Sequence, residues 1–152
     1  MVDAAPIPAE TGNMVSDSCV CLALQRAART VARRFDKALK PLGLSNGQFS
    51  LLMLLTAESP PSITGLAAAL AMDRTTLTAS LKPLGKRGLI SVTPDPRDRR
   101  NRRVALTEAG QALLRQAMPL WHRAQAATLE RRNPVALNDL RRGLRALASQ
   151  ET

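Results

Sequence analysis

The segment DPRDRRNRRV, residues 95–104, places five arginines and two aspartates within ten residues. Arginine stays charged at any physiological pH, and its planar fork of donors matches the oxygens of a phosphate group. Like charges at this density repel one another unless an anion binds them or a neighbouring carboxylate pairs with them. Asp95 and Asp98 can pair with neighbouring arginines. The residue types therefore predict contact with a polyanion.

The positive charge of the chain is concentrated around this segment. The 152 residues carry 22 Lys and Arg against 12 Asp and Glu, a net charge of +10. Residues 73–103 hold nine basic and three acidic residues, which is more than half of that excess. A localised positive field favours nucleic acid as the partner, with an anionic membrane surface second. A generally basic protein without such a partner is the plain alternative.

The segments around the arginines predict two short helices followed by a hairpin. Ser62 can cap a short helix, and Asp73 can cap a second helix over residues 74–86 after a tight turn at Ala71 and Met72. Alternating strands are expected over residues 89–93 and 102–107, with the arginine segment between them. This order is typical of a winged helix-turn-helix, which is a mainly α fold with a small β-hairpin wing.

The exposed face of the helix over residues 74–86 combines threonine with arginine and lysine. Small hydroxyl side chains let a helix approach the major groove closely and can bond to bases or phosphates. Arginine at the tip of a hairpin suits the minor groove, where the potential is most negative. The two elements together predict a surface for double-stranded DNA.

The remaining segments are expected to frame this unit. Residues 1–16 contain prolines and a glycine in polar surroundings and are expected to form a mobile arm. The core must be built from Leu, Ala and Val, because the chain has two Phe, one Trp and no Tyr. One helix is expected over about 18–40, and a second from the Ser45–Gln48 capping box to the breaker at 58–62. A third is expected over about 108–131, after a cap at Thr107 and with a kink at Pro119, and a fourth from Pro134 onward.

The stretch ITGLAAALAMDRTTLTASLKPLGKRGLISVTPDPRDRRNRRVALTEAG, residues 63–110, resembles the DNA-binding core of MarR-type transcriptional regulators. The resemblance extends from about residue 18 to residue 149. One departure is Ala71, where a glycine is common at the turn, and a slightly different turn geometry is expected there. The family's wing pattern, D-x-R-D-x-R and then L-T-x-x-G, is matched by Asp95, Arg97, Asp98 and Arg100 and by Leu106, Thr107 and Gly110.

The resemblance implies a homodimer formed by N- and C-terminal dimerisation helices, bound to a pseudopalindromic operator. Family members usually repress and release DNA when a small ligand or an oxidant acts. By this resemblance the chain is one integrated domain with an arm (1–16), dimerisation helices (17–42 and 108–152) and a winged helix-turn-helix region (43–107). The residues that it assigns to DNA contact, with Asp98 orienting an arginine, are Ser62, Thr64, Arg74, Thr75, Thr76, Thr78, Lys82, Arg97, Asp98, Arg99, Arg100 and Arg102.

The two cysteines offer a second kind of chemistry. The stretch SDSCVCLALQRAAR resembles the first helix of the organic-peroxide-sensing OhrR branch, in which an aromatic residue, Ala and Leu follow a cysteine. Here Leu22 takes the aromatic position, and the tyrosines of that branch are missing. Three interpretations stay open for Cys19 and Cys21. Cys21 is a small buried helix residue with Cys19 as a bystander, or the pair senses oxidant, or it binds a soft metal or thiophilic ligand.

Two other functions compete with gene regulation. Cys21 could serve a thiol-based peroxide-reducing enzyme, but a single histidine and the lack of a phosphate-binding glycine loop argue against an enzyme. A winged helix can also act as a protein–protein interaction module, which has no need for an arginine-dense tip. We assign no cofactor and no metal. The N-terminus has no export signal and no apolar run reaches the ~20 residues of a membrane span, so a cytoplasmic location is expected.

Overall fold

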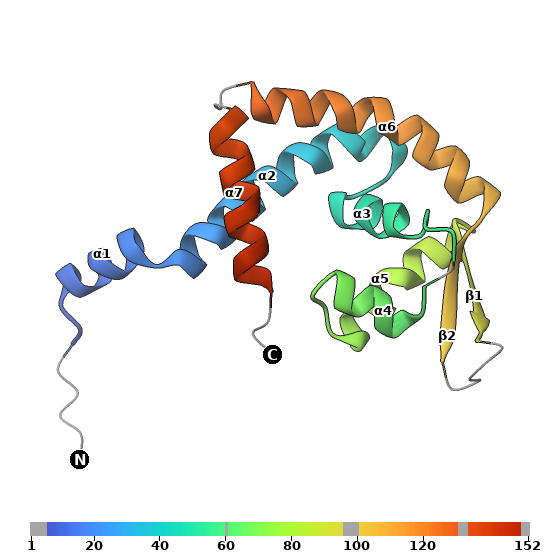
Figure 1. The fold of residues 1–152 in the computed structure, drawn as a ribbon, viewed down its shortest axis with the longest axis horizontal. Helices are drawn as coiled ribbons and strands as arrows, with labels where there is room; N and C mark the ends of the chain where they lie inside the picture. Colours follow the sequence, from blue (N-terminus) through green and yellow to red (C-terminus); the bar gives the residue numbers. More distant parts are fainter. Residues whose placement is uncertain (1–5, 60, 96–100, 131–133, 150–152) are drawn as a thin grey trace, which may run out of the picture.

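A computed structural model describes residues 6–59, 61–95, 101–130 and 134–149 of the chain (Figure 1). The described residues form α-helices and, at one edge of the molecule, one antiparallel two-stranded sheet, in the predicted winged helix-turn-helix order. In chain order, the elements are α1 (Ala9–Ser18), α2 (Val20–Leu39), the 3-10 helix η1 (Lys40–Leu42), α3 (Asn46–Leu54), α4 (Ile63–Ala69), α5 (Arg74–Lys86), β1 (Ile90–Pro94), β2 (Arg102–Leu106), α6 (Glu108–Leu129) and α7 (Pro134–Ala148).

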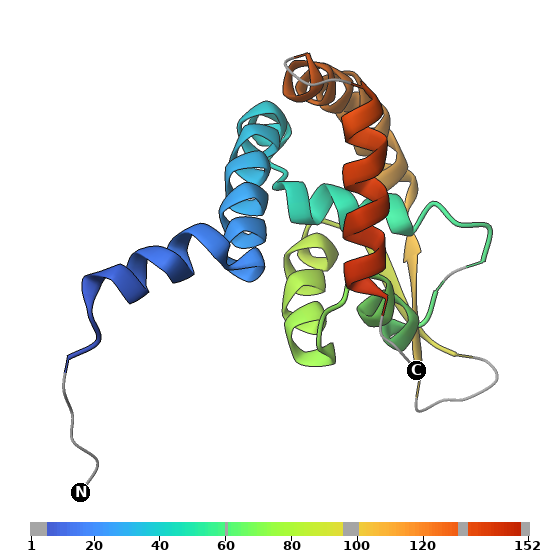
Figure 2. The same cartoon turned by 60° about the vertical axis from the view of Figure 1, so that its left-hand side comes forward.

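The N-terminal part differs from the prediction. The arm expected over residues 1–16 is helical from Ala9 onward, so that part of the prediction is wrong, whereas residues 1–5 lie outside the described part. The helix expected over about 18–40 is present as α2, and Cys19, whose ψ of 107° is extended, separates it from α1. The Cys19 Sγ accepts a hydrogen bond from the Leu22 backbone N–H at 3.5 Å, which begins α2 anew. Figure 2 shows α1 leading away from the rest of the molecule.

Four of the predicted helix caps are confirmed. Ser45 and Gln48 form a reciprocal capping box at the start of α3. The side chains of Ser62, Asp73 and Thr107 each accept a hydrogen bond from the backbone N–H three residues later. These bonds satisfy orphan donors in the first turn, and they set where α4, α5 and α6 begin.

The core is built mainly from leucines, as expected. Helices α2 and α6 pack against each other, and α3 packs against both. Phe35 and Phe49 flank Trp121, and their ring centroids lie 6.4 Å and 6.2 Å, respectively, from that of Trp121. Helix α6 continues through Pro119 as one helix. The most deeply buried side chains are Leu39, Leu51, Leu52, Leu66, Leu77, Leu84 and Val104.

Helix α7 follows α6 and turns back along the molecule (Figure 1), and it stands apart from α2 in the rotated view of Figure 2. The described residues contain no helix that combines the length and the apolar character needed to cross a bilayer.

Candidate nucleic-acid interface

Helix α5 has one buried and one exposed face. Leu77, Leu81 and Leu84 are buried in the core and fix the rotation of the helix about its axis. The opposite face is open to solvent. It carries five of the residues that the sequence assigned to DNA contact, Arg74, Thr75, Thr76, Thr78 and Lys82.

Asp73 organises the first turn of this helix. Its carboxylate accepts hydrogen bonds from the Thr76 backbone N–H at 2.8 Å and from Thr76 Oγ1 at 2.6 Å. The bond from the Thr76 hydroxyl is the main cause that lowers the pKa of Asp73 below its usual 3.8. Thr78 Oγ1 donates to the Arg74 carbonyl at 2.7 Å. The protons of both hydroxyls are therefore used within the helix, and the two threonines offer methyl groups and acceptor lone pairs outward.

Helix α4 and the turn after it place α5. Ser62 caps α4, its Oγ lying 3.0 Å from the Gly65 backbone N, and Thr64 is exposed one residue into the helix. Ala71 has a φ of +50°, which is the left-handed conformation that glycine adopts without strain. The expected change of turn geometry is therefore small, since Ala71 takes the conformation that a glycine would.

The base of the wing is held by an ion pair. Strands β1 and β2 pair in register from Ile90 with Leu106 to Pro94 with Arg102. The buried Asp95 follows β1, and its Oδ2 lies 2.8 Å from Nε of Arg103. The prediction that Asp95 pairs with a nearby arginine is confirmed. Arg103, which the sequence did not assign to the site, is the residue that it holds.

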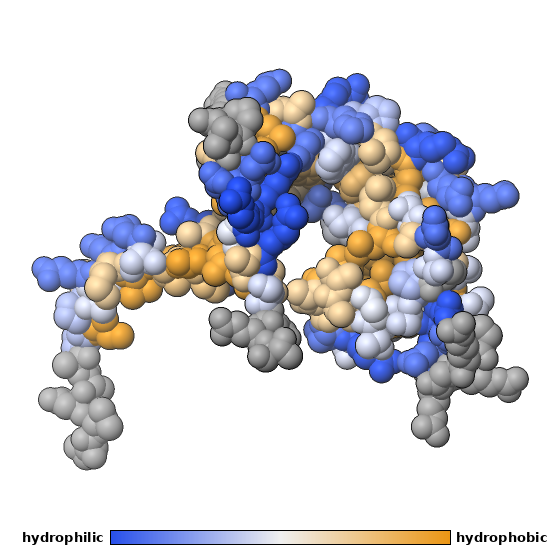
Figure 3. Space-filling model, viewed as in Figure 1, coloured by the Kyte–Doolittle hydropathy of each residue, from blue (hydrophilic) through white to orange (hydrophobic). Residues whose placement is uncertain are grey.

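The wing is also tied to the helix-turn-helix. The Val104 backbone N–H donates to the Pro61 carbonyl at 3.1 Å, and Ser62 forms a bridge with Arg103. Helices α4 and α5 and the hairpin consequently lie at the same end of the molecule in both ribbon views. In Figure 3, hydrophilic side chains line the lower edge of the molecule along this end.

The predicted wing contacts fall partly outside the described residues. Arg102 is exposed and is the first residue of β2. The residues of the tip, Arg97, Asp98, Arg99 and Arg100, lie in the segment that the structure does not describe.

One positioning contact had no signal in the sequence. Arg87, directly after α5, donates hydrogen bonds to the carbonyls of Gly43 and Leu42 in the turn after α2. The contact joins residues more than 40 positions apart, and a lone arginine beside Gly88 does not indicate it.

The cysteines do not fit the interpretation in which Cys21 is a buried helix residue. Cys19 is half-buried and caps α2, whereas Cys21 is exposed and its Sγ lies 3.3 Å from Gln25 Nε2. Both thiols are free. Among the described residues, no group of three or more His, Cys, Asp or Glu side chains is placed to hold a metal ion.

Two cavities border α3 and α6. One of about 440 Å³ is lined by residues of α3, α4 and α6 that include Phe49, Leu70 and Trp121. The other, of about 640 Å³, lies between the end of α3, strand β2 and α6. Cys21 lines neither of them.

The model of the MarR family matches residues 44–101 of this chain, which run from the start of α3 into the wing. Among curated proteins, the HTH-type transcriptional repressor NicR of Pseudomonas putida is 40% identical over 76 residues, which are 50% of this chain and 48% of NicR. The organic hydroperoxide resistance transcriptional regulator of Bacillus subtilis is 26% identical over 71% of this chain and 74% of its own length. The chain thus spans about half of NicR and about three quarters of the Bacillus protein.

A solved structure extends the likeness over most of the chain. The M. tuberculosis transcriptional regulator MOSR, in complex with DNA, superposes with a TM-score of 0.79 and 35% identity. The match covers 86% of this chain and 94% of MOSR. A transcriptional regulator of the MarR family from Rhodococcus sp. RHA1 is 30% identical over 88% of this chain and 94% of its own, with a TM-score of 0.78, and this establishes that the chain belongs to the MarR family.

Proposed function

We propose that this protein is a homodimeric, sequence-specific DNA-binding transcriptional regulator that represses its targets and leaves DNA when a small ligand or thiol oxidant acts. The observation that carries the proposal is the exposed α5 face held at one end of the molecule with the wing. Asp95 and Arg103 brace the hairpin, and the Val104–Pro61 bond fixes it to the start of α4. One rigid unit thus presents both elements that a duplex requires.

The contacts divide between the grooves and the backbone. We assign Arg74, Thr75, Thr76, Thr78 and Lys82 to the major groove, where Thr78 presents a methyl group and an acceptor because its proton is already bonded. Ser62, Thr64 and Arg102 are assigned to phosphates at the flank of the groove. Arg97, Arg99 and Arg100, with Asp98 orienting an arginine, are assigned to the minor groove.

A second copy of the chain is proposed to cover the apolar faces of the outer helices. Val20, Leu24 and Val31 of α2 are more than one-third exposed, and Figure 3 displays hydrophobic residues along this part of the surface. Helix α7 exposes Leu140, Leu144 and Leu147, which recur at a spacing of four and three residues and so share one face. Contiguous apolar faces of this kind mark association surfaces.

The signal that releases DNA is proposed to reach the protein through a ligand or through the thiols. Oxidation by a hydroperoxide would convert Cys21 to a sulfenic acid, which Cys19 could then attack to form a disulfide with loss of water. That bond would remove the Sγ of Cys19 from the Leu22 N–H and unwind the first turn of α2. MOSR was crystallised with DNA, and the Bacillus relative is named for hydroperoxide resistance.

We propose no catalytic role for the chain and a cytoplasmic location, in keeping with relatives that are named as transcriptional regulators. An exposed Cys21 leaves a peroxide-reducing enzyme as the competing function, and turnover separates the two. Catalytic consumption of hydroperoxide in molar excess over protein, with a thiol reductant present, would overturn the regulator assignment.

A salt titration of DNA binding tests the proposal directly. The logarithm of the association constant is expected to fall with the logarithm of salt concentration, with a slope of about 0.9 per neutralised phosphate. Footprinting should reveal two half-sites about one helical turn apart. A flat salt dependence would instead favour the protein–protein interaction module.

A further inference from the structure

Helix α1 is poorly stabilised within its own subunit. Its ten residues include Gly12, none of its side chains is buried, and no side chain caps its N-terminus. Helices of fewer than about 12 residues are marginal in water unless they pack against another element. Figure 2 shows α1 leading away from the rest of the molecule, and Met14 and Val15 are 61% and 48% exposed. The helix therefore needs a surface on another molecule.

The charge of the chain changes sign between α1 and α2. Residues 1–25 contain three acidic and no basic residues, whereas residues 26–40 contain six basic residues and one acidic residue. That acidic residue, Asp36, already accepts a hydrogen bond from the Asn46 backbone N–H at 2.6 Å. The cations of α2 are therefore left to attract carboxylates from elsewhere.

The acidic residues of α1 share one face with a methionine. Glu10, Met14 and Asp17 are spaced by four and three residues, so they lie in one row along the helix. All three are exposed, and neither ion pair within the described part of the chain involves the two carboxylates. The face thus consists of an apolar side chain between two negative charges.

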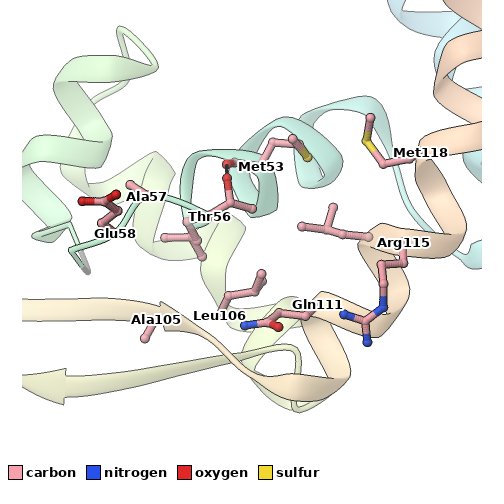
Figure 4. Close-up of a pocket in the computed structure, with 11 residues that line it drawn as sticks. Met53, Thr56, Ala57, Glu58, Ala105, Leu106, Gln111, Arg115 and Met118 are labelled. Carbon is pink, nitrogen blue, oxygen red and sulfur yellow. Dashed lines mark hydrogen bonds between the residues drawn. The ribbon is translucent and has the colours of Figure 1, made fainter.

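A groove of about 940 Å³ between α2 and α6 offers the complementary surface. Alanines of both helices line it, and its exposed cations are Arg34, Lys37 and Arg123. One carboxylate, Glu130, lies among these described lining residues, so the cations outnumber it. Small side chains let a further helix approach closely. The groove shares no lining residue with the cavity beside the wing that Figure 4 shows.

Helix α1 does not reach the groove of its own subunit. Arg34 lies 14 residues beyond Val20, the first residue of α2, which is about 21 Å along the helix. Both ribbon views show α1 leading away from the other end of α2. The groove that α1 can occupy is therefore that of a second copy of the chain.

The proposed DNA-binding dimer, on which this step rests, brings α1 to that groove. The DNA surface follows the C-terminal end of α2, and half-sites on a duplex lie about 34 Å apart, so the two α2 helices lead away from the two-fold axis in opposite directions. An axis through the middle of the exposed apolar face, from Val20 to Val31, places each of these residues opposite the other in the partner. Three residues farther out, Asp17 lies opposite the partner's Arg34.

We propose that α1 docks in the α2–α6 groove of the partner subunit, with Met14 over the alanines and with Glu10 and Asp17 against the cations. The extended backbone at Cys19 lets α1 turn from the line of α2 into this groove. Each dimer then holds two such contacts, related by the two-fold axis. They lie outside the apolar faces of the outer helices and weaken with salt, because their charges are exposed.

Two charge-reversed forms of the full-length chain test the contact without DNA. In the α1 form, Glu10→Lys and Asp17→Lys make the helix face basic. In the groove form, Arg34→Glu and Lys37→Glu make the groove acidic. All four side chains are exposed, so the fold is expected to remain. Each form repels itself in a homodimer, whereas a dimer of one α1 form and one groove form matches opposite charges at both contacts.

Native mass spectrometry measures the pairing after equal amounts of the two forms are unfolded and refolded together. Random pairing makes heterodimers about one half of all dimers, and the proposal raises that share to about three quarters, which is about a tenfold change in the exchange constant. A single chain with all four substitutions is expected to regain the dimer stability of the parent protein. A share of one half would overturn the proposal, because an α1 bound to its own subunit gives no preference.

A second pair of forms controls for net charge. One carries Glu58→Lys and Glu108→Lys, and the other carries Lys82→Glu and Lys86→Glu, all at exposed positions outside α1 and the groove. These forms have the same net charges as the test pair and are expected to pair at random. A control pair that favours heterodimers as strongly as the test pair would also overturn the proposal.

Operator binding by the same proteins separates this inference from the proposed function. A parent dimer that binds DNA, together with random pairing of the test forms, would remove the α1 contact and keep the regulator. Preferred pairing in a protein that binds no DNA would keep the contact and remove the regulator. A parent protein that sediments as a monomer would overturn both the contact and the proposed homodimer.

Discussion

The guanidinium of Arg87 is bonded to the carbonyl of Gly43, with Nη1 2.7 Å from the oxygen, and Nη2 reaches the neighbouring Leu42 carbonyl at 3.0 Å. Gly43 sits in a left-handed conformation with φ of 62°, in the turn that follows α2. The end of the α5 helix is thus anchored to the end of α2, which belongs to the proposed dimer interface. A change in how two subunits pack can therefore be transmitted to the helix that is proposed to contact DNA.

Replacement of Arg87 is expected to weaken DNA binding while the fold remains. Arg87→Gln removes the hydrogen bonds to the two carbonyls, so the C-terminal end of α5 loses its link to the turn after α2. We expect about tenfold weaker operator binding by fluorescence anisotropy, with the dimer unchanged in sedimentation. Arg26 is an exposed arginine on α2, and Arg26→Gln serves as the control because it removes the same charge. Equal losses in both variants would mean that only net charge matters.

Gly110 is expected to tolerate no side chain. A Cβ at this position would overlap the carbonyl oxygen of Leu89 and approach Cδ1 of Leu106 to 2.7 Å. Gly110→Ala should lower the free energy of unfolding by about 1–3 kcal/mol, because backbone must move to admit the methyl group. Gly85→Ala in α5 has nothing within 4 Å and should stabilise by about 0.5–1 kcal/mol. Urea unfolding of the two variants measures the contrast.

Glycine at position 71 is expected to stabilise the turn between α4 and α5. Ala71 holds a φ of +50°, which costs an L-residue about 1 kcal/mol and glycine much less. Ala71→Gly should therefore raise the free energy of unfolding by up to about 1 kcal/mol. A decrease measured by urea unfolding would mean that the lost chain entropy outweighs the relieved strain.

The cap at Asp73 predicts a dependence on pH. Since its pKa is lowered in the folded protein, the ionised carboxylate stabilises α5 above the ordinary value of 3.8, and the benefit is lost as pH falls through the lower folded pKa. Asp73→Ala should therefore be less stable than the parent near neutral pH, with a difference that shrinks below pH 3.8. Asp73→Asn, which keeps an acceptor for the Thr76 N–H, should retain most of the stability. Thermal unfolding across pH 3–7 measures the difference in stability between the parent protein and the two variants.

The ion pair at the wing base predicts a linked effect on DNA. Asp95→Asn weakens the hold on Arg103, whose side chain is 30% exposed, and should cost about 1 kcal/mol of stability. Because the pair holds the base of the wing, whose arginines are proposed to contact DNA, DNA affinity should fall as well. Arg103→Lys keeps the positive charge but not the planar guanidinium, and should retain only part of the parent protein's DNA affinity. Equal DNA affinity of the parent protein, Asp95→Asn and Arg103→Lys would mean that the ion pair does not contribute to DNA recognition.

Local features of the sequence were sufficient for the helix starts and the wing. Ser45, Ser62, Asp73 and Thr107 were each predicted as caps and each is one, because a cap and its partner lie three residues apart. The leucine spacing of α5 likewise determined which threonines face outward. The arm over residues 1–16 was misjudged, because Gly12 and the polar residues around it did not prevent a helix from Ala9 to Ser18.

The resemblance of the D-x-R-D-x-R wing pattern to that of MarR-type regulators predicted the family, and the leucine periodicity of α5 predicted which of its faces is exposed. Only the tertiary structure decided that Arg87 reaches Gly43, that Arg103 is the partner of Asp95, and that Leu89 leaves no room at Gly110. These contacts join residues from eight to 44 positions apart. A local pattern does not determine such distances, because they depend on how the buried leucines pack the helices together.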